Sequence, residues 1–297
     1  MTTLADLETK IASDQPFTRA DAERFASCID LVTVGALGES VRRARRGNDV
    51  TYGRVLCIDG PLPAAGPGEA GEVRLVGPAT DQAALVARIR AARAFAGDKV
   101  LSGFSLDTLA DLTGGDHLAL ADLASALRDA GLDAVADAPI DGLGDTEHAV
   151  GIVRAALHGG LGVWRATIRR ADAPARLDLI ERAIAIQQET GAFRAFAPLP
   201  IEDPANEPST GYDDVRTVAV ARCWGTALPS IQVDWSLYGP KLAQVAIAFG
   251  ADDIDGVSTV DELQLGHRRS PKEDIERQIR AAFANPVERD GRYEIRG

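Results

Sequence analysis

Residues 99–137, KVLSGFSLDTLADLTGGDHLALADLASALRDAGLDAVAD, contain the repeating unit from which the fold is predicted. The apolar runs 99–104 and 132–137 have the length and flanking residues of buried strands. The stretch 117–131 between them shows the spacing of apolar residues that is typical of an amphipathic helix. A strand, a helix and a second strand in this order form a parallel β-α-β unit.

The same alternation continues on both sides of this unit. Strands are predicted at 53–58, 72–77, 99–104, 132–137, 161–168, 193–199, 229–235 and 252–257. Helices are predicted at 80–96, 117–131, 145–158, 174–190, 211–223, 239–249 and 271–284. So regular a repeat is typical of a (β/α)8 TIM-type barrel, and an open doubly wound sheet is the alternative. We expect an N-terminal helical extension at 1–50, with helices at 3–11, 18–29 and 36–46, and a barrel with a C-terminal tail at 51–297.

One unit of the barrel is incomplete. Residues 59–71, DGPLPAAGPGEAG, contain three prolines and four glycines between the first two strands. Proline and glycine interrupt helices, so this segment is expected to cross as an extended loop. The first barrel helix is therefore predicted to be missing. The flank that it would cover should be bare and apolar, or covered by another part of the chain.

Composition excludes several classes of function. The chain has 44 acidic and 32 basic residues, a net charge of −12, which argues against binding to nucleic acid or to an anionic membrane surface. No apolar run approaches the roughly 20 residues that span a bilayer, and the polar first 30 residues do not resemble a signal peptide. Three widely spaced cysteines indicate a reducing compartment. We expect a cytoplasmic protein.

Four segments resemble the radical-SAM enzymes of the futalosine route to menaquinone, the aminofutalosine synthases and dehypoxanthine futalosine cyclases. They are residues 20–52 (ADAERFASCIDLVTVGALGESVRRARRGNDVTY), 189–209 (ETGAFRAFAPLPIEDPANEPS), 237–257 (LYGPKLAQVAIAFGADDIDGV) and 284–296 (ANPVERDGRYEIR). The last two are the most specific, and the resemblance extends from about residue 4 to residue 296. It implies a helical cap followed by a (β/α)8 barrel, in agreement with the periodicity.

The resemblance also implies a cofactor whose ligands this sequence lacks. In that family a Cys-x3-Cys-x2-Cys motif follows the first strand and holds a [4Fe–4S] cluster, whose open iron binds S-adenosylmethionine. Here the cysteines are Cys28, Cys57 and Cys223, and the segment after the first strand contains none. The family patterns after strands two, four and five are replaced by Gly77-Pro78, by residues 137–141 and by residues 167–170. We therefore expect no iron–sulfur cluster, no other metal and no radical chemistry.

Polar residues at the predicted C-terminal ends of strands are the candidates for a ligand site, because barrels place their sites there. These candidates are Ser105, Asp141, Arg169, Arg170, Glu202, Asp234 and Asp255. Arg169 or Arg170 suits a carboxylate or phosphate of a ligand, or pairs with nearby aspartates and holds the mouth together. Asp253 and Asp255 are expected to share one face of the last strand.

Taken together, the sequence predicts a cluster-less homologue, a pseudoenzyme of the futalosine group that works as a non-redox binding or partner subunit linked to menaquinone biosynthesis. Its partner would be a second copy or an intact radical-SAM relative. One alternative is a non-radical enzyme that uses an acidic barrel mouth with Arg169 and Arg170 on a small polar metabolite. Another is a protein that binds a nucleoside or S-adenosylmethionine without turnover. Whether the chain is an enzyme, and which residues would be catalytic, stays open.

Overall fold

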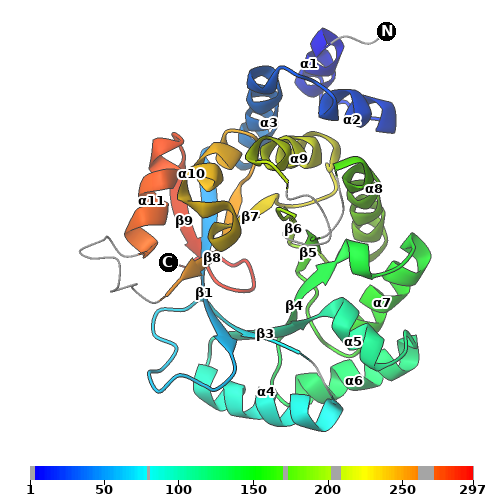
Figure 1. The fold of residues 1–297 in the computed structure, drawn as a ribbon, viewed down its shortest axis with the longest axis vertical. Helices are drawn as coiled ribbons and strands as arrows, with labels where there is room; N and C mark the ends of the chain where they lie inside the picture. The colour runs from blue at the N-terminus through cyan, green and yellow to red at the C-terminus, as the bar shows by residue number, and fades with distance from the viewer. Residues whose placement is uncertain (1–3, 79–80, 170–172, 202–208, 260–270, 297) are drawn as a thin grey trace.

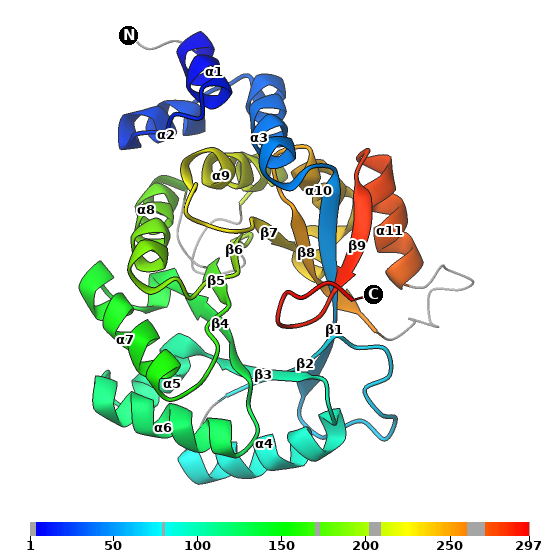
Figure 2. The same cartoon turned by 180° about the vertical axis from the view of Figure 1, so that it is seen from behind.

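The computed structural model of the chain describes residues 4–78, 81–169, 173–201, 209–259 and 271–296. Eight parallel strands follow one another around a ring (Figures 1 and 2). They are β1 (Asp49–Asp59), β2 (Glu72–Val76), β3 (Val100–Ser105), β4 (Ala134–Pro139), β5 (Arg165–Ile168), β6 (Ala195–Pro198), β7 (Gln232–Asp234) and β8 (Asp253–Ser258). β1 pairs with both β2 and β8, and β6 meets β7 through a single parallel bridge between Phe196 and Ile231. The predicted barrel is confirmed.

Helices surround this ring (Figure 1). They are α4 (Gln82–Ala96), α6 (His117–Asp129), α7 (Thr146–His158), α8 (Ala173–Thr190), α9 (Gly211–Trp224), α10 (Trp235–Ile247) and α11 (Pro271–Ala281), with the short α5 (Leu106–Leu112) and η1 (Ile140–Gly142) after β3 and β4. Their apolar faces are buried through residues such as Ile89, Leu127, Ile152, Ile180 and Val218. Within the described ranges, no helix is both long and apolar enough to traverse a bilayer.

Three helices precede the barrel: α1 (Leu4–Ala12), α2 (Arg19–Ala26) and α3 (Leu31–Arg46). α3 begins five residues earlier than the predicted helix at 36–46, because the Asp30 side chain accepts hydrogen bonds from the N–H groups of Val32 and Thr33. It ends at Gly47, which takes a positive φ of 63°. The division into an extension at 1–50 and a barrel at 51–297 stays a prediction.

The missing first helix is confirmed. Residues 60–71 connect β1 to β2 without a helix, and most of them are exposed to solvent. In both views this connection lies outside the ring of strands (Figures 1 and 2). A ninth strand, β9 (Asn285–Arg289), which the apolar pattern did not predict, pairs in parallel with residues 49–53 of β1.

Of the two alternatives for the flank beside β1, bare and apolar or covered by another part of the chain, the structure shows the second. Arg54 of β1 donates from Nε and Nη2 to Glu288 Oε1 of β9, at 2.9 and 2.8 Å. Arg296 donates to the same oxygen at 2.9 Å. The hydroxyl of Tyr52 donates to Glu276 of α11 at 2.8 Å. Segments from the far end of the chain thus cover this flank with hydrogen bonds and ion pairs.

α3 packs closely on the barrel through its glycines. A Cβ atom added to Gly38 would stand 2.3 Å from the carbonyl oxygen of Phe249 and 3.3 Å from Cβ of Ala219 in α9. One end of the same helix is tied down by Arg46, whose Nε lies 3.0 Å from Asp252 Oδ2. Since a backbone oxygen cannot swing aside as a flexible side chain does, α3 itself would have to shift to admit a larger residue at position 38.

The substitution Gly38→Ala is therefore expected to lower the free energy of unfolding by about 1–3 kcal/mol. Gly66→Ala is the matched control, because an added Cβ at Gly66 meets no atom within 4 Å. Urea denaturation followed by circular dichroism measures both variants. Equal midpoints for Gly38→Ala and the wild type would show that α3 does not depend on this close approach.

Candidate functional site

Charged side chains from several strands meet inside the ring of strands. Asp255 of β8 accepts a hydrogen bond from Arg74 Nη1 of β2 at 2.8 Å and another from Arg289 Nη2 of β9 at 3.0 Å. Its carboxylate also lies 3.7 Å from Nε of Arg165 in β5. β2 and β5 lie on different sides of the ring. The side chain of Asp255, which contacts residues of both strands, therefore points into the interior. Arg74 has a second partner, Glu72, at 2.8 and 3.0 Å.

These charges determine the ionisation of the cluster. Burial alone would raise the pKa of Asp255, but the guanidinium groups of Arg74, Arg165 and Arg289 outweigh burial and hold that pKa far below its usual range. The pKa of Arg74 is correspondingly raised well above its usual value: burial lowers it, and Asp255 and Glu72 more than reverse this effect. Asp255 therefore stays charged throughout the physiological pH range.

The C-terminal tail contributes side chains to the same interior. Arg289 holds both carboxylate oxygens of Asp253, each at 2.8 Å, and its guanidinium carbon lies 4.1 Å from the ring centre of Tyr293. The Tyr293 hydroxyl accepts a hydrogen bond from Gln232 Nε2 of β7 at 3.0 Å. Gly53 of β1 makes room for Arg289, because a Cβ there would stand 2.5 Å from Nη1. The expectation that Asp253 and Asp255 share a face is confirmed, since both contact Arg289.

A second group of charges lies where β4 and β5 end. Arg169 Nη2 lies 2.5 Å from Asp137 Oδ2, and the same oxygen accepts a hydrogen bond from the Thr167 hydroxyl at 2.7 Å. The backbone N–H of Arg169 donates to Asp141 Oδ2 at 3.0 Å. Arg169 thus pairs with a nearby aspartate, as the ion-pair alternative predicts. Asp137 is fully buried, and its Oδ1 atom has no hydrogen-bond partner in the described part of the chain.

Ser105 takes part in a local helix start rather than in either group. Its hydroxyl donates to the carboxylate of Asp107 and lies 2.8 Å from the Thr108 hydroxyl, both in the first turn of α5. Asp234 caps α10 in a similar way, with Oδ1 accepting from the N–H and hydroxyl of Ser236 at 3.0 and 2.6 Å. These two candidates have structural partners already.

The candidate site residues that the structure describes therefore do not form one group. Asp234 and Asp255 come together around Arg165, at 3.1 and 3.7 Å, whereas Asp141 and Arg169 form part of the separate group at the ends of β4 and β5. Arg170 and Glu202 lie outside the described residues. Binding of a ligand by any of the candidates stays a prediction.

Sequence reasoning missed most of the interior cluster. Its unpredicted members are Glu72, Arg74, Arg165, Arg289 and Tyr293. One signal was available: Glu72 and Arg74 alternate with Val73 and Leu75 in the strand EVRLV, so both face the side opposite to those two apolar residues. No comparable signal exists for Arg289, because the tail segment NPVER lacks an apolar strand pattern.

The three cysteines lie on three separate parts of the fold. Cys28 lies between α2 and α3, Cys57 lies within β1, and Cys223 lies within α9. Cys223 is buried, and burial raises the pKa of its thiol to about 12. Among the residues that the structure describes, no three His, Cys, Asp or Glu side chains are grouped so that they could hold a metal ion.

Comparison with known proteins gives partial relatives. No protein-family profile matches the chain. Aminodeoxyfutalosine synthase of Thermus thermophilus is 36% identical over 137 residues, 41% of this chain and 37% of that enzyme. The Streptomyces coelicolor enzyme of the same name is 32% identical over 143 residues, 40% and 36% of the two chains. The 5-amino-6-(D-ribitylamino)uracil–L-tyrosine 4-hydroxyphenyl transferase of Archaeoglobus fulgidus is 32% identical over 165 residues, 50% and 45%. The matched parts span less than half of each relative.

Solved structures match over nearly the whole chain. Methylornithine synthase (PylB) superposes with a TM-score of 0.67 at 14% identity, covering 95% of this chain and 97% of that one. The FeFe-hydrogenase maturase HydG from Carboxydothermus hydrogenoformans superposes with a TM-score of 0.65 at 12% identity, covering 95% and 79%. These structures bear out the barrel fold. The resemblance to the enzymes of the futalosine route is confirmed by the aminodeoxyfutalosine synthases.

The interior cluster predicts a large effect of one isosteric substitution. Asp255→Asn removes the carboxylate charge that Arg74, Arg165 and Arg289 share, and leaves each buried arginine with a single remaining carboxylate partner. The expected loss is about 3–5 kcal/mol of unfolding free energy at pH 7, measured by urea denaturation. Asp98→Asn, in the exposed turn after α4, changes the net charge equally and should stay within about 0.5 kcal/mol of the wild type. Indistinguishable midpoints for the two variants would contradict this role for Asp255.

The low pKa of Asp255 predicts how the stability of the folded chain changes at acid pH. Because the pKa of Asp255 is lower in the folded chain than the roughly 3.9 of an unfolded aspartate, its stabilising contribution is present above that value. The contribution is lost as the pH falls below about 5. The difference in stability between the wild type and Asp255→Asn should therefore shrink between about pH 5 and pH 3, measured by denaturation across that range. A difference that stays constant would count against the ion pairs.

Proposed function

We propose that the chain is a cluster-less homologue of the futalosine-pathway radical-SAM enzymes and acts as a non-redox binding or partner subunit linked to menaquinone biosynthesis. The observation that carries this proposal is the distribution of its thiols over the connection between α2 and α3, strand β1 and helix α9. The relation to the aminodeoxyfutalosine synthases supports the link to the pathway.

The thiols do not suit the cluster that the family resemblance implies. Three cysteine thiolates on one cluster must come within a few Å of the same group of irons. Cys28 lies between the N-terminal helices α2 and α3 and Cys223 lies in α9, whereas Cys57 is part of the ring strand β1. The segment 60–71, which follows β1, contains no cysteine and lies outside the ring (Figures 1 and 2).

The state of the interior charges favours binding or structural roles over acid–base catalysis. A general acid or base works best when its pKa lies near the working pH. Asp255 has a pKa far below that range, because three guanidinium groups face it. Its partner Arg74 is occupied by Glu72 as well. These groups neutralise one another, and a substrate would have to break several ion pairs to use them.

One observation favours the alternative of a ligand site at the ends of β4 and β5. The Oδ1 atom of Asp137 is buried without a hydrogen-bond partner in the described residues, although such atoms usually have one. Arg169 lies beside it, and its side chain is 39% exposed. A small polar metabolite with a donor and an anionic group matches this pair. A stabilising ligand in a thermal-shift screen that loses its effect in Arg169→Ala would support this alternative.

The proposed function predicts a colourless protein. After purification and reconstitution with iron and sulfide without oxygen, the chain should retain far less than one iron per chain and show no visible absorption band. A brown protein with about four irons and four sulfides per chain would overturn the proposal. The variant Cys57→Ser would then show whether the thiol on β1 is a ligand.

A further inference from the structure

A hollow of about 320 Å³ lies at the base of the barrel, opposite to the strand ends that carry the candidate site residues. Asp133 and Trp164 line it, and they lie just before the first residues of β4 and β5. Arg128 in the last turn of α6 and Arg292 of the C-terminal tail also line it. The volume is at the lower end of the range for small-molecule sites, which suits a ligand of one or two rings.

Positive charge exceeds negative charge around this hollow. Asp133 Oδ1 lies 2.9 Å from Arg128 Nη1 and 3.1 Å from Arg292 Nη2. The other carboxylate oxygen lies 2.5 Å from Arg93 Nη2. Burial raises the pKa of Asp133, but the backbone N–H of Leu101 and the guanidinium groups more than reverse this effect, so the carboxylate is charged. Among the described residues no other carboxylate pairs with these arginines, so three positive charges face one negative charge in a chain of net charge −12.

The two arginines that line the hollow keep hydrogen-bond donors for a ligand. Arg128 and Arg292 are 47% and 46% exposed. Each uses a single guanidinium nitrogen, Nη1 of Arg128 and Nη2 of Arg292, for its hydrogen bonds within the described chain. Their remaining N–H groups are therefore available, and two planar guanidinium groups beside one hollow suit the oxygens of a carboxylate or a phosphate.

An indole ring provides the apolar wall of the same hollow. The ring of Trp164 lies against Gly162, where an added Cβ would stand 2.4 Å from Cε2. Trp164 is only partly buried, although both of its neighbours in the chain are buried. A half-buried indole that rests on a glycine and borders a hollow offers a flat surface on which an aromatic ring can stack.

The fold fixes the position of Arg292, although it belongs to the tail. The N–H of Gly291 donates to the carbonyl oxygen of Gly71 at 3.1 Å, and the N–H of Arg292 donates to Asp290 Oδ1 at 2.8 Å. The preceding Arg289 is anchored in the barrel interior by Asp253. The second cation of the hollow is thus held in place before any ligand arrives, which lowers the entropic cost of binding.

We propose that this hollow binds a small aromatic anion, with the ring on Trp164 and the carboxylate or phosphate group on Arg128 and Arg292. An inorganic anion would use the arginines alone, whereas the indole adds a reason for the ligand to be aromatic. The hollow lies at the opposite edge of the barrel from the ends of β4 and β5, so this inference goes beyond the proposed function and does not depend on it.

Isothermal calorimetry with four probes tests the chemistry of the ligand. Phenyl phosphate and benzoate carry both a ring and an anionic group, inorganic phosphate has no ring, and benzyl alcohol has no charge. We expect one-to-one binding of phenyl phosphate or benzoate with a dissociation constant below about 1 mM, at least about tenfold tighter than inorganic phosphate and benzyl alcohol. The tighter of the two aromatic anions identifies the preferred anionic group. Absence of saturable binding by both, or equally tight binding of inorganic phosphate, would overturn the proposal.

Variants place the ligand in the hollow. Arg292→Gln removes one cation and is expected to raise the dissociation constant of the aromatic anion about tenfold or more. Trp164→Ala should weaken the aromatic anion to the level of inorganic phosphate, whereas Trp164→Phe keeps a ring and should retain most of the affinity. Arg154→Gln is the matched control, because Arg154 is 58% exposed, pairs with the single carboxylate of Glu189 and does not line the hollow. Circular dichroism confirms that each variant is folded. Unchanged affinity in folded Arg292→Gln and Trp164→Ala would overturn the proposal.

Discussion

The buried charge of Asp255 constrains the rest of this barrel. A carboxylate without exposure to water must have compensating partners, and Arg74, Arg165 and Arg289 provide them from β2, β5 and β9. The last of these partners requires the C-terminal tail to pair with β1 and Gly53 to leave space for its guanidinium. The ring of strands, the tail and the ionic interior are therefore parts of one arrangement.

The strand–helix periodicity predicts the barrel well, because each strand and each helix is recognised from its own apolar pattern. The missing helix is predicted from the prolines and glycines of residues 59–71 for the same local reason. The sequence left open whether the flank beside β1 is bare or covered, because its cover comes from Glu288, more than 200 positions along the chain from Arg54. At the candidate site, the ends of strands locate Asp234 and Asp255, but their arginine partners depend on register and on the tail.

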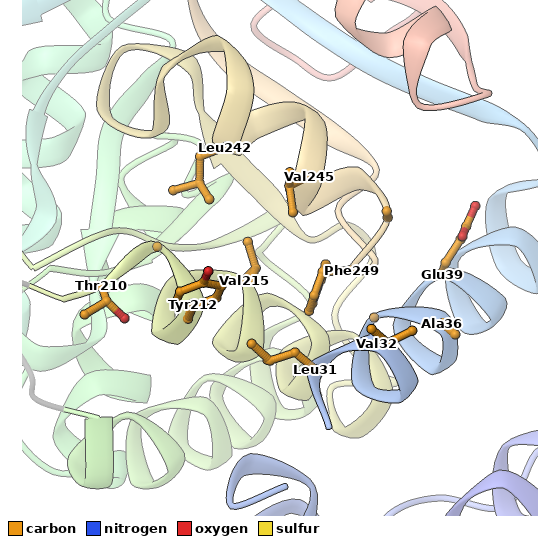
Figure 3. A pocket seen from close by; sticks show the side chains of 13 residues that line it. Leu31, Val32, Ala36, Glu39, Thr210, Tyr212, Val215, Leu242, Val245 and Phe249 are labelled. Carbon is orange, nitrogen blue, oxygen red and sulfur yellow. The ribbon is translucent and has the colours of Figure 1, made fainter. Parts of the chain in front are cut away.

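The chain shares its barrel fold with methylornithine synthase and HydG. The segment after β1 lacks thiols, and the interior charges are satisfied by one another. A largely apolar groove lies between α3, α9 and α10 (Figure 3). Close packing at Gly38 fixes α3 against α9 and so holds both walls of that groove in place. Interior charges that pair with one another and an apolar groove on the outside of the barrel are both compatible with the proposed partner role.

Titration with S-adenosylmethionine by isothermal calorimetry tests the central claim most directly. In the family that this sequence resembles, the open iron of the cluster binds that molecule, and here the segment after β1 provides no thiolate for such an iron. The account predicts no saturable heat up to about 1 mM ligand, which corresponds to binding weaker than about −4 kcal/mol. Saturable binding of one molecule per chain with a micromolar dissociation constant would contradict it.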